Sequence, residues 1–164
     1  QHLEKMAVAG ISEMQRLVSG LHPPQLDDLG LRAALRWYAN EVKTLYNLPI
    51  SINGLETGPQ LTAEERIVFF RIAQEAVTNI VRHACATQAT MIHNNTEHYV
   101  SLAVEDNGQG FDVEAALRKD SKQANWGLLG MIERAGLVGG NCTINSQPGK
   151  GTKIEIYLPR ETVK

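Results

Sequence analysis

The sequence contains no uninterrupted apolar run as long as the roughly 18 residues that a membrane-spanning helix needs. Its first ten residues lack the basic and then apolar order of a secretory signal peptide. Neither sign of charge dominates, because 16 basic residues stand against 18 acidic ones, so no overall field attracts nucleic acid or an anionic membrane. We therefore expect a soluble cytoplasmic chain without nucleic-acid or membrane contact, and anchoring of the intact protein in the inner or plasma membrane stays open.

Cysteine is also scarce, with Cys85 and Cys142 far apart in the sequence. They form no CxxC pair and share no Cys/His spacing, which favours buried free thiols over a disulfide or a metal site. That pattern is typical of a reducing compartment. At 164 residues and 43% hydrophobic content, the chain has the length of one domain, with or without a short appendage, and can bury a substantial core.

Two common phosphate-binding motifs are absent. Neither GxxxxGK[ST] nor GxGxxG occurs, so the sequence supports neither a P-loop nor a Rossmann nucleotide site. Any phosphate must therefore be bound by another architecture.

The first segment has a helical apolar seam that ends at a pair of prolines. Steps of four and three residues separate its apolar positions, as in a helix that packs against another helix. These positions are Leu3, Ala7, Ile11, Met14, Val18 and Leu21. Pro23 and Pro24 cannot continue that helix, so we interpret residues 22–30 as a linker.

The remaining elements follow from periodicity and turn residues. Thr62 and Glu65 form a capping box, which predicts a long helix from there to Ala84. The polar stretch 112–126 is interpreted as a mobile loop. Other helices are expected at 31–46 and 128–138. Strands are expected at 49–53, closed by the turn pair Asn53-Gly54, at 89–95 and at 98–106, with two more in 141–158 that turn at 148–151.

A polar stripe on the long helix is the first candidate site. Five side chains fall within an arc of roughly 100°, and they are Arg71, Glu75, Thr78, Asn79 and Arg82. The stripe could be an ordinary solvated face. However, Glu75 and Asn79 lie one turn apart and can present a carboxylate and an amide oxygen to one point, which suits Mg²⁺ shared with substrate phosphates.

Glycine pairs form the second candidate set: Gly108 with Gly110, Gly127 with Gly130, and Gly149 with Gly151. Each pair alone is explained by turn chemistry. Gly127 and Gly130 open a helix, however, and a glycine-rich helix N-terminus offers free N–H groups to phosphate.

Four segments in order resemble the motifs of the GHKL ATPases. QEAVTNIVRHA (74–84) resembles the N box, EDNGQGFD (105–112) the G1 box, GLLGMIERA (127–135) the G2 box and PGKGTKIEI (148–156) the final glycine-threonine strand. LHPPQLDDLGL and GMIERA further resemble sensor histidine kinases of the nitrate/nitrite-sensor type. The resemblance implies the Bergerat fold, an α/β (α+β) two-layer sandwich whose mixed sheet is covered on one face by helices, with ATP bound under a mobile lid at 112–126.

The resemblance also implies roles for single residues. Glu75 would be the catalytic polar or general-base group near the γ-phosphate, Asn79 the Mg²⁺ ligand, and Asp106 the acceptor for the adenine amino group. Thr152 would help to hold adenine. The remaining nucleotide contacts would come from Arg82, His83, Gly108, Gly110, Gly127, Leu128, Leu129 and Gly130.

The implied organisation is that of a kinase without its phosphoacceptor histidine, since no motif resembling E-L-H-D is present. Residues 1–21 would be the end of the second dimerisation helix, 22–30 a linker and 31–164 the catalytic ATP-binding domain. With ATP and Mg²⁺ as cofactors, the intact homodimer would transfer the γ-phosphoryl to a histidine and then to a response regulator. The chain alone is not expected to phosphorylate itself.

Three alternatives stay open. An anti-sigma-type serine kinase has the same fold, although the LHPPQLDDLGL segment argues against a free-standing one. ATP-driven clamps such as gyrase B, MutL or the ninety-kilodalton heat-shock chaperone need a transducer domain, and none fits after Lys164. A non-catalytic module, in which nucleotide switches a dimer, is the alternative from another class.

Overall fold

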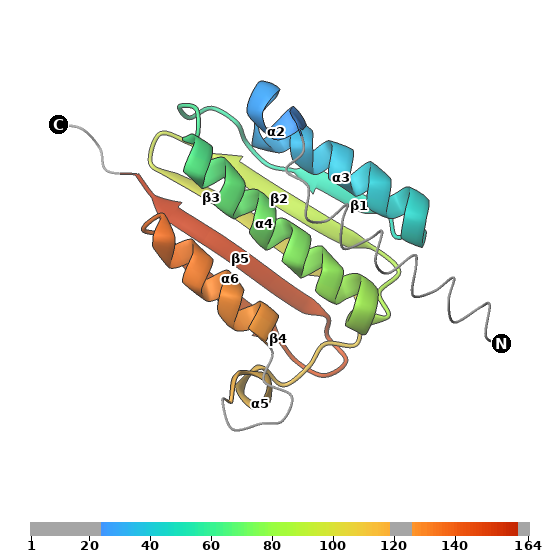
Figure 1. Ribbon diagram of the computed structural model, residues 1–164. Coiled ribbons are helices and arrows are strands. Elements are labelled where there is room, and N and C mark those ends of the chain that lie inside the picture. Colours follow the sequence, from blue (N-terminus) through green and yellow to red (C-terminus); the bar gives the residue numbers. More distant parts are fainter. Residues whose placement is uncertain (1–23, 119–125, 161–164) are drawn as a thin grey trace, which may run out of the picture.

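The computed structural model describes residues 24–118 and 126–160, which form a mixed five-stranded sheet with helices on one face (Figure 1). The sheet order is β1-β2-β3-β5-β4, with β1 parallel to β2 and the other neighbours antiparallel. The strands are β1 Ile50–Asn53, β2 Ala89–Asn95, β3 Tyr99–Asp106, β4 Asn141–Ser146 and β5 Thr152–Pro159. The helices are α2 Pro24–Asp28, α3 Leu31–Tyr46, α4 Ala63–Asn79, η1 Ile80–Ala84, α5 Val113–Leu117 and α6 Trp126–Leu137. The expected two-layer architecture is confirmed.

The core lies between the sheet and helices α3, α4 and α6, which run side by side across it (Figure 1). Alternate residues of paired strands face the helices because successive side chains in a strand point to opposite faces. On β3 and β5 these are the cross-strand pairs Val100 with Leu158, Leu102 with Ile156, and Val104 with Ile154. At the end of this register Asp106 lies opposite Thr152, so the last residue of β3 and the first of β5 are neighbours.

Helix α4 begins where the sequence predicts and ends differently. The Glu65 backbone N–H donates to the Thr62 hydroxyl over 3.2 Å, and the Thr62 N–H donates to the Glu65 carboxylate over 2.7 Å. The capping box is therefore confirmed. The predicted regular helix to Ala84 is wrong in its last part, since η1 is a turn of π-helix.

The segment 22–30, interpreted as a linker, contains helix α2. Pro24 is its first residue, a position that suits proline because the missing N–H would have no helical partner there. Leu26 is 1% exposed and belongs to the core, so this segment packs on the domain. The seam predicted in residues 1–21 lies outside the described residues, and the domain boundaries stay predictions.

The stretch interpreted as a mobile loop, 112–126, contains ordered structure at both described ends. Asp112 caps α5 by accepting a hydrogen bond from the Ala115 N–H over 3.0 Å, and Trp126 begins α6. Residues 119–125 lie outside the described part of the chain. No helix among the described residues is both long and apolar enough to cross a membrane.

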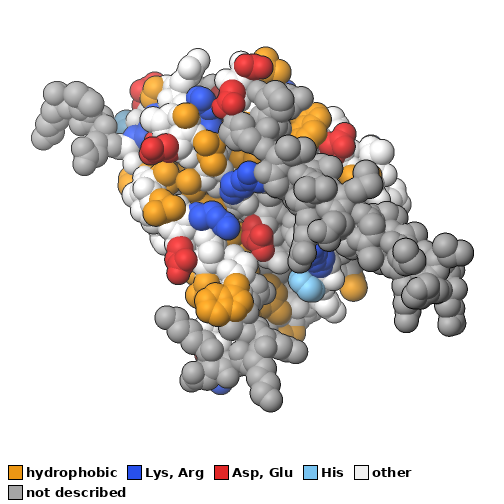
Figure 2. All heavy atoms as spheres, viewed as in Figure 1, with side chains coloured by type: hydrophobic (Ala, Val, Ile, Leu, Met, Phe, Trp, Pro, Cys, Tyr) orange, Lys and Arg blue, Asp and Glu red, His pale blue; other side chains and the backbone are white. Residues whose placement is uncertain are grey.

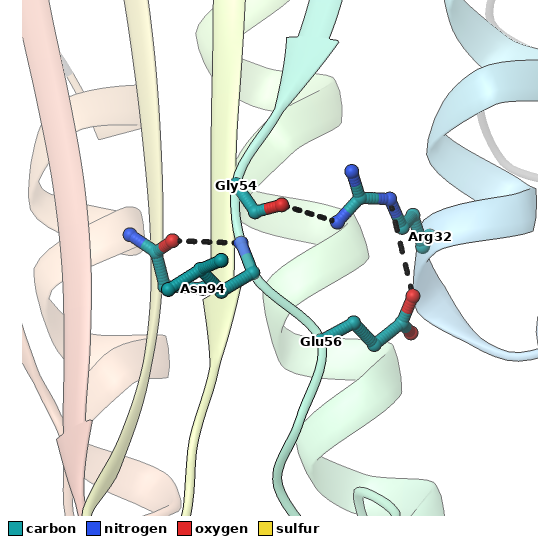
Figure 3. Close-up of polar contacts among 5 residues, drawn as sticks. Arg32, Gly54, Glu56 and Asn94 are labelled. Carbon is teal, nitrogen blue, oxygen red and sulfur yellow. Dashed lines mark hydrogen bonds and ion pairs between the residues drawn. The ribbon is translucent and has the colours of Figure 1, made fainter.

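The turn after β1 is fixed from both sides (Figure 3). The Arg32 guanidinium of α3 donates to the Gly54 carbonyl over 3.1 Å and lies 3.9 Å from the Glu56 carboxylate. The Leu55 N–H donates to the Asn94 side chain on β2. Gly54 has φ +116°, and a Cβ there would stand 2.0 Å from the His93 carbonyl oxygen, so the predicted turn requires glycine.

The two cysteines differ in exposure. Both are free thiols, as predicted, but only Cys142 is buried, where burial raises its pKa to about 11. Cys85 is exposed, which corrects the expectation that both are buried. It follows η1 with φ 51°, in the left-handed region.

Candidate functional site

A cavity of about 740 Å³ opens where α4, η1 and α6 meet the ends of β3 and β5. This volume is within the range of small-molecule pockets, roughly 300–1,000 Å³. Its lining residues are Ala76, Asn79, Ile80, His83, Ala84, Val104, Asp106, Gln109, Gly110, Phe111, Ala115, Ala116, Trp126, Leu128, Thr152 and Ile154. Segments from both halves of the sequence therefore form a single site.

Half of the residues predicted from the sequence line this cavity. They are Asn79, His83, Asp106, Gly110, Leu128 and Thr152. The others lie outside its lining, and they are Glu75, Arg82, Gly108, Gly127, Leu129 and Gly130. The cavity thus joins one residue of the polar helix stripe, Asn79, to the acidic strand end and the start of α6.

Asp106 is a half-buried carboxylate that its neighbours hold in place. The Gly108 N–H donates to its Oδ1 over 2.7 Å. Burial raises the pKa of Asp106, and backbone hydrogen bonds from Gly108 and Thr152 act in the opposite direction. Each carboxylate oxygen can accept two hydrogen bonds, so the Asp106 carboxylate keeps acceptor capacity for a ligand in addition to these backbone donors.

His83 lines the cavity and Arg82 does not, although both side chains are exposed. At roughly 100° per residue, His83 lies about 40° around the helix from Asn79 and Arg82 about 60° in the other direction. The lining residues Ala76 and Ile80 lie on the His83 side. Both basic residues belong to η1, a turn of π-helix.

Asn79 has an unsatisfied polar atom in this cavity. Its amide nitrogen is buried without a hydrogen-bond partner, which is unusual because most buried polar groups are paired. The nitrogen and oxygen of an amide can exchange places by rotation, so the side chain can offer either a donor or an oxygen ligand here. No cluster of three His, Cys, Asp or Glu side chains exists among the described residues, so a protein-only metal cage is not formed there.

These features fit a Mg²⁺ ion that is shared with a ligand. Mg²⁺ prefers oxygen ligands, keeps several waters, and is usually bound by one or two protein groups together with substrate phosphates. Asn79 could supply one such oxygen, with the remaining ligands coming from substrate phosphates and water.

Glu75 faces α3 instead of the cavity. It is partly buried close to Tyr38, whose pKa is raised to about 12, mainly by burial. A hydrogen bond with Thr78 opposes that shift, whereas Tyr46 and Glu75 add to it. The predicted catalytic carboxylate is therefore next to a buried phenol, and its role stays a prediction.

The glycines around Asp106 are required by close backbone packing. A Cβ at Gly108 would lie 2.3 Å from the Ala84 carbonyl oxygen, and one at Gly110 would lie 2.1 Å from that of Gln147. A Cβ at Gly151, which has φ +72°, would lie 2.0 Å from the backbone carbonyl oxygen of Asp106. Gly110 also lines the cavity, so this close backbone packing forms part of the cavity wall.

Two residues that the sequence reasoning missed stabilise this site. Ser146 accepts a hydrogen bond from the Phe111 N–H over 2.9 Å, donates to the Gly151 carbonyl and lies 3.0 Å from the Thr152 hydroxyl. Gln109 donates to the carbonyls of the π-turn, through its side chain to His83 and its backbone to Ala84. Pairing across the β4–β5 hairpin would have revealed Ser146, whereas no sequence signal marked Gln109.

Comparison with known proteins adds a family match. The model described as "Histidine kinase-, DNA gyrase B-, and HSP90-like ATPase" matches residues 64–162. The kinase/phosphatase DegS of Bacillus subtilis is 39% identical over 141 residues, covering 84% of this chain and 36% of DegS. The sensor histidine kinase LiaS of the same organism is 33% identical over 157 residues, covering 96% of this chain and 42% of LiaS. The chain therefore spans well under half the length of these relatives.

Solved structures agree on the fold. The histidine kinase domain of a blue-light activated kinase from Erythrobacter litoralis superimposes with a TM-score of 0.57 at 18% identity, covering 79% of this chain and 60% of that one. The ATP-binding domain of PrrB from Mycobacterium tuberculosis gives 0.53 at 22% identity, covering 76% of this chain and 89% of that one.

Proposed function

The chain belongs to the family of histidine kinase-, DNA gyrase B- and HSP90-like ATPases, and on that premise we propose that its cavity binds Mg-ATP for phosphoryl transfer in a sensor histidine kinase. One observation carries the proposal. A single cavity joins a fixed carboxylate, Asp106, to an amide with an unsatisfied atom, Asn79. A nucleotide needs an acceptor for its base and an oxygen ligand for its metal, and this cavity offers both.

At the base end of the site, Asp106 accepts the adenine amino group. The carboxylate is at the end of a strand and is oriented by the loop, so its remaining acceptor capacity has a fixed place in the cavity. The Thr152 hydroxyl, held by Ser146, lies beside it as a second polar contact. Gly110 lines the cavity near the base or sugar.

At the phosphate end, Asn79 provides the protein oxygen for Mg²⁺ and His83 contacts a phosphate. When bound, the metal would neutralise charge that develops on the phosphates. The start of α6, with Gly127, Leu128, Leu129 and Gly130, lies on the phosphate side in this proposal, where the partial positive charge of a helix N-terminus favours an anion. Arg82 and Gly108 lie outside the cavity lining, so we assign Arg82 a peripheral phosphate contact and Gly108 the close packing of the loop.

We further propose that Glu75 is the polar or general-base group in transfer of the γ-phosphoryl to a histidine, which this sequence does not carry in an E-L-H-D motif. The phosphoryl group would then pass to a response regulator.

Residues 1–21 would belong to the dimerisation helix of a homodimer, 22–30 to a linker and 31–164 to the catalytic domain. The nitrate/nitrite-sensor type is the subfamily that the motifs favour.

Calorimetric titration with ATP, with and without Mg²⁺, tests nucleotide binding. Asn79→Ala is expected to weaken Mg-ATP at least about tenfold, the effect of losing a charge-assisted contact of roughly 1.5–3 kcal/mol, and to weaken metal-free ADP much less. Asn40→Ala, at an exposed position of α3, is the matched control and should change neither affinity. Equal losses for both ligands would contradict the metal role of Asn79, and an absence of saturable heat in the parent protein would contradict the function.

Phosphoryl transfer needs a second test. A separately made helical segment with an E-L-H-D histidine should become labelled by ATP only when this chain is added. Glu75→Gln is expected to reduce the labelling rate while leaving ATP affinity close to that of the parent, since Glu75 does not line the cavity. A rate unchanged by Glu75→Gln would remove this residue from catalysis.

A further inference from the structure

Trp126 is the most exposed aromatic residue among those described. Its side chain is 78% exposed, against 44% for Tyr157 and 37% for Tyr46. Exposed hydrophobic side chains are visible at the lower end of the helical face, where α6 begins (Figure 2). Trp126 also lines the cavity, so an indole stands at its mouth with most of its surface accessible.

The indole is carried by a rigid element. Leu128, Met131 and Ala135 are buried and fix α6 against the sheet. Trp126 and Leu128 both line the cavity. Leu128 is 1% exposed and belongs to the core, whereas Trp126 is 78% exposed, so the core packing that usually accounts for a tryptophan does not explain this one.

The neighbouring wall leaves room beside the indole. Ala115 and Ala116 of α5 contribute only methyl groups, and Phe111 adds a second, half-buried ring. Asp106 lines the same cavity from the strand end. The cavity therefore combines an aromatic surface with a fixed hydrogen-bond acceptor, which together suit a flat heteroaromatic ring bearing an amino group.

We propose that Trp126 is a base-recognition residue of this site, whose indole stacks on the purine ring of the bound nucleotide. The inference rests on the proposed nucleotide-binding function and extends it to a residue that no motif marked. Stacking acts on the base and not on the phosphates. Its loss should therefore affect ATP, ADP and adenosine by the same factor and leave Mg-tripolyphosphate binding unchanged.

Trp126→Leu and Trp126→Phe form the matched pair for this test, since leucine keeps apolar bulk and phenylalanine keeps a ring. Trp126→Leu should weaken ATP, ADP and adenosine about 5- to 100-fold, the effect of losing one base-aromatic stack. Trp126→Phe should restore affinity to within about threefold of the parent. Because the residue is exposed, both variants should melt at the parental temperature without nucleotide.

Fluorescence provides a second measurement, because the emission of Trp126 would not respond to nucleotide if this residue had only a structural role. Of the two tryptophans, Trp37 lies on α3 outside the cavity, so Trp37→Phe leaves Trp126 as the only emitter. Saturating ATP or adenosine should quench this emission, and Mg-tripolyphosphate should not.

The outcomes separate the two proposals. Parental ATP affinity in Trp126→Leu, together with unquenched emission at saturating ATP, would overturn the stacking role and leave nucleotide binding standing. A loss of tripolyphosphate binding equal to that of ATP would also overturn it. If the parent protein binds none of these ligands, the proposed function fails and the inference fails with it.

Discussion

At the scale of single residues, His93 shows how burial shifts the pKa of a side chain. Its ring is 1% exposed, and neither nitrogen has a hydrogen-bond partner. Burial lowers its pKa to about 4, and the nearby positive charge of Arg32 acts in the same direction. The folded protein therefore keeps this imidazole neutral at pH values where an unfolded chain binds a proton.

The free energy of unfolding should consequently decrease as the pH is lowered. An unfolded histidine titrates near pH 6.5, so the contribution is complete above that pH and is lost as the pH falls toward about 4. The loss approaches about 3 kcal/mol. Urea unfolding between pH 7.5 and 4.5 measures it. His93→Leu should flatten this dependence and His98→Gln, at an exposed position, should not; equal slopes in all three proteins would contradict the account.

Arg82 and His83 provide a second residue-scale prediction, because the sequence predicts a nucleotide contact for both and only His83 lines the cavity. His83→Ala should weaken Mg-ATP binding by about tenfold if it removes one hydrogen bond to a charged phosphate. Arg82→Ala should weaken it only about twofold, the effect of a screened charge outside the cavity lining. Calorimetry at physiological salt compares them. A larger loss for Arg82 would mean that Arg82, and not His83, contacts the nucleotide.

At the scale of elements, the loop after β3 is held against the β4–β5 hairpin by contacts that only glycine permits. Gly151→Ala places a Cβ against the Asp106 carbonyl in addition to a left-handed backbone and should destabilise the fold by more than about 2 kcal/mol. Gly139→Ala is the control, since it has φ +75° and open space around it, and should lose only about 1 kcal/mol. Chemical unfolding measures both, and equal losses would show that the contact is unimportant.

Local signals were sufficient for elements whose causes are local. The capping box at Thr62 and the turn at Gly54 depend on neighbouring residues, and both are present as predicted. The strand expected at 98–106 is present as β3, although its burial does not alternate, because residues 100–104 are all buried. The π-turn was not predictable in this way, because α- and π-turns have similar apolar spacing over five residues. Helix α2 was missed because Leu26 is stabilised by the core, a contact that is invisible in the linker sequence.

At the scale of the whole molecule, four motifs in order predicted the family and the sheet-and-helix architecture, and both are confirmed. The cavity could not be predicted in the same detail. Which side chains line it depends on how η1, α5 and α6 close around the strand ends, and this separates His83 from Arg82 and includes Trp126. The assigned roles of the site residues remain proposals that rest on this arrangement.

The central claim is that Asp106 accepts a hydrogen bond from an adenine base in this cavity, and base preference tests it most directly. Adenine presents an amino donor where guanine presents a carbonyl oxygen, so the carboxylate should favour ATP over GTP. Asp106→Asn keeps an acceptor for the Gly108 N–H and places an amino donor on the ligand side.

Calorimetric titration of both nucleotides, in the parent protein and in Asp106→Asn, is the decisive measurement. The parent should bind ATP at least about tenfold more tightly than GTP, and Asp106→Asn should lose ATP affinity by about 10- to 100-fold while GTP binding is kept or improved. Asp28→Asn, at an exposed position on α2, should behave as the parent. Equal affinities for ATP and GTP in the parent, or an ATP affinity unchanged in Asp106→Asn, would contradict the account.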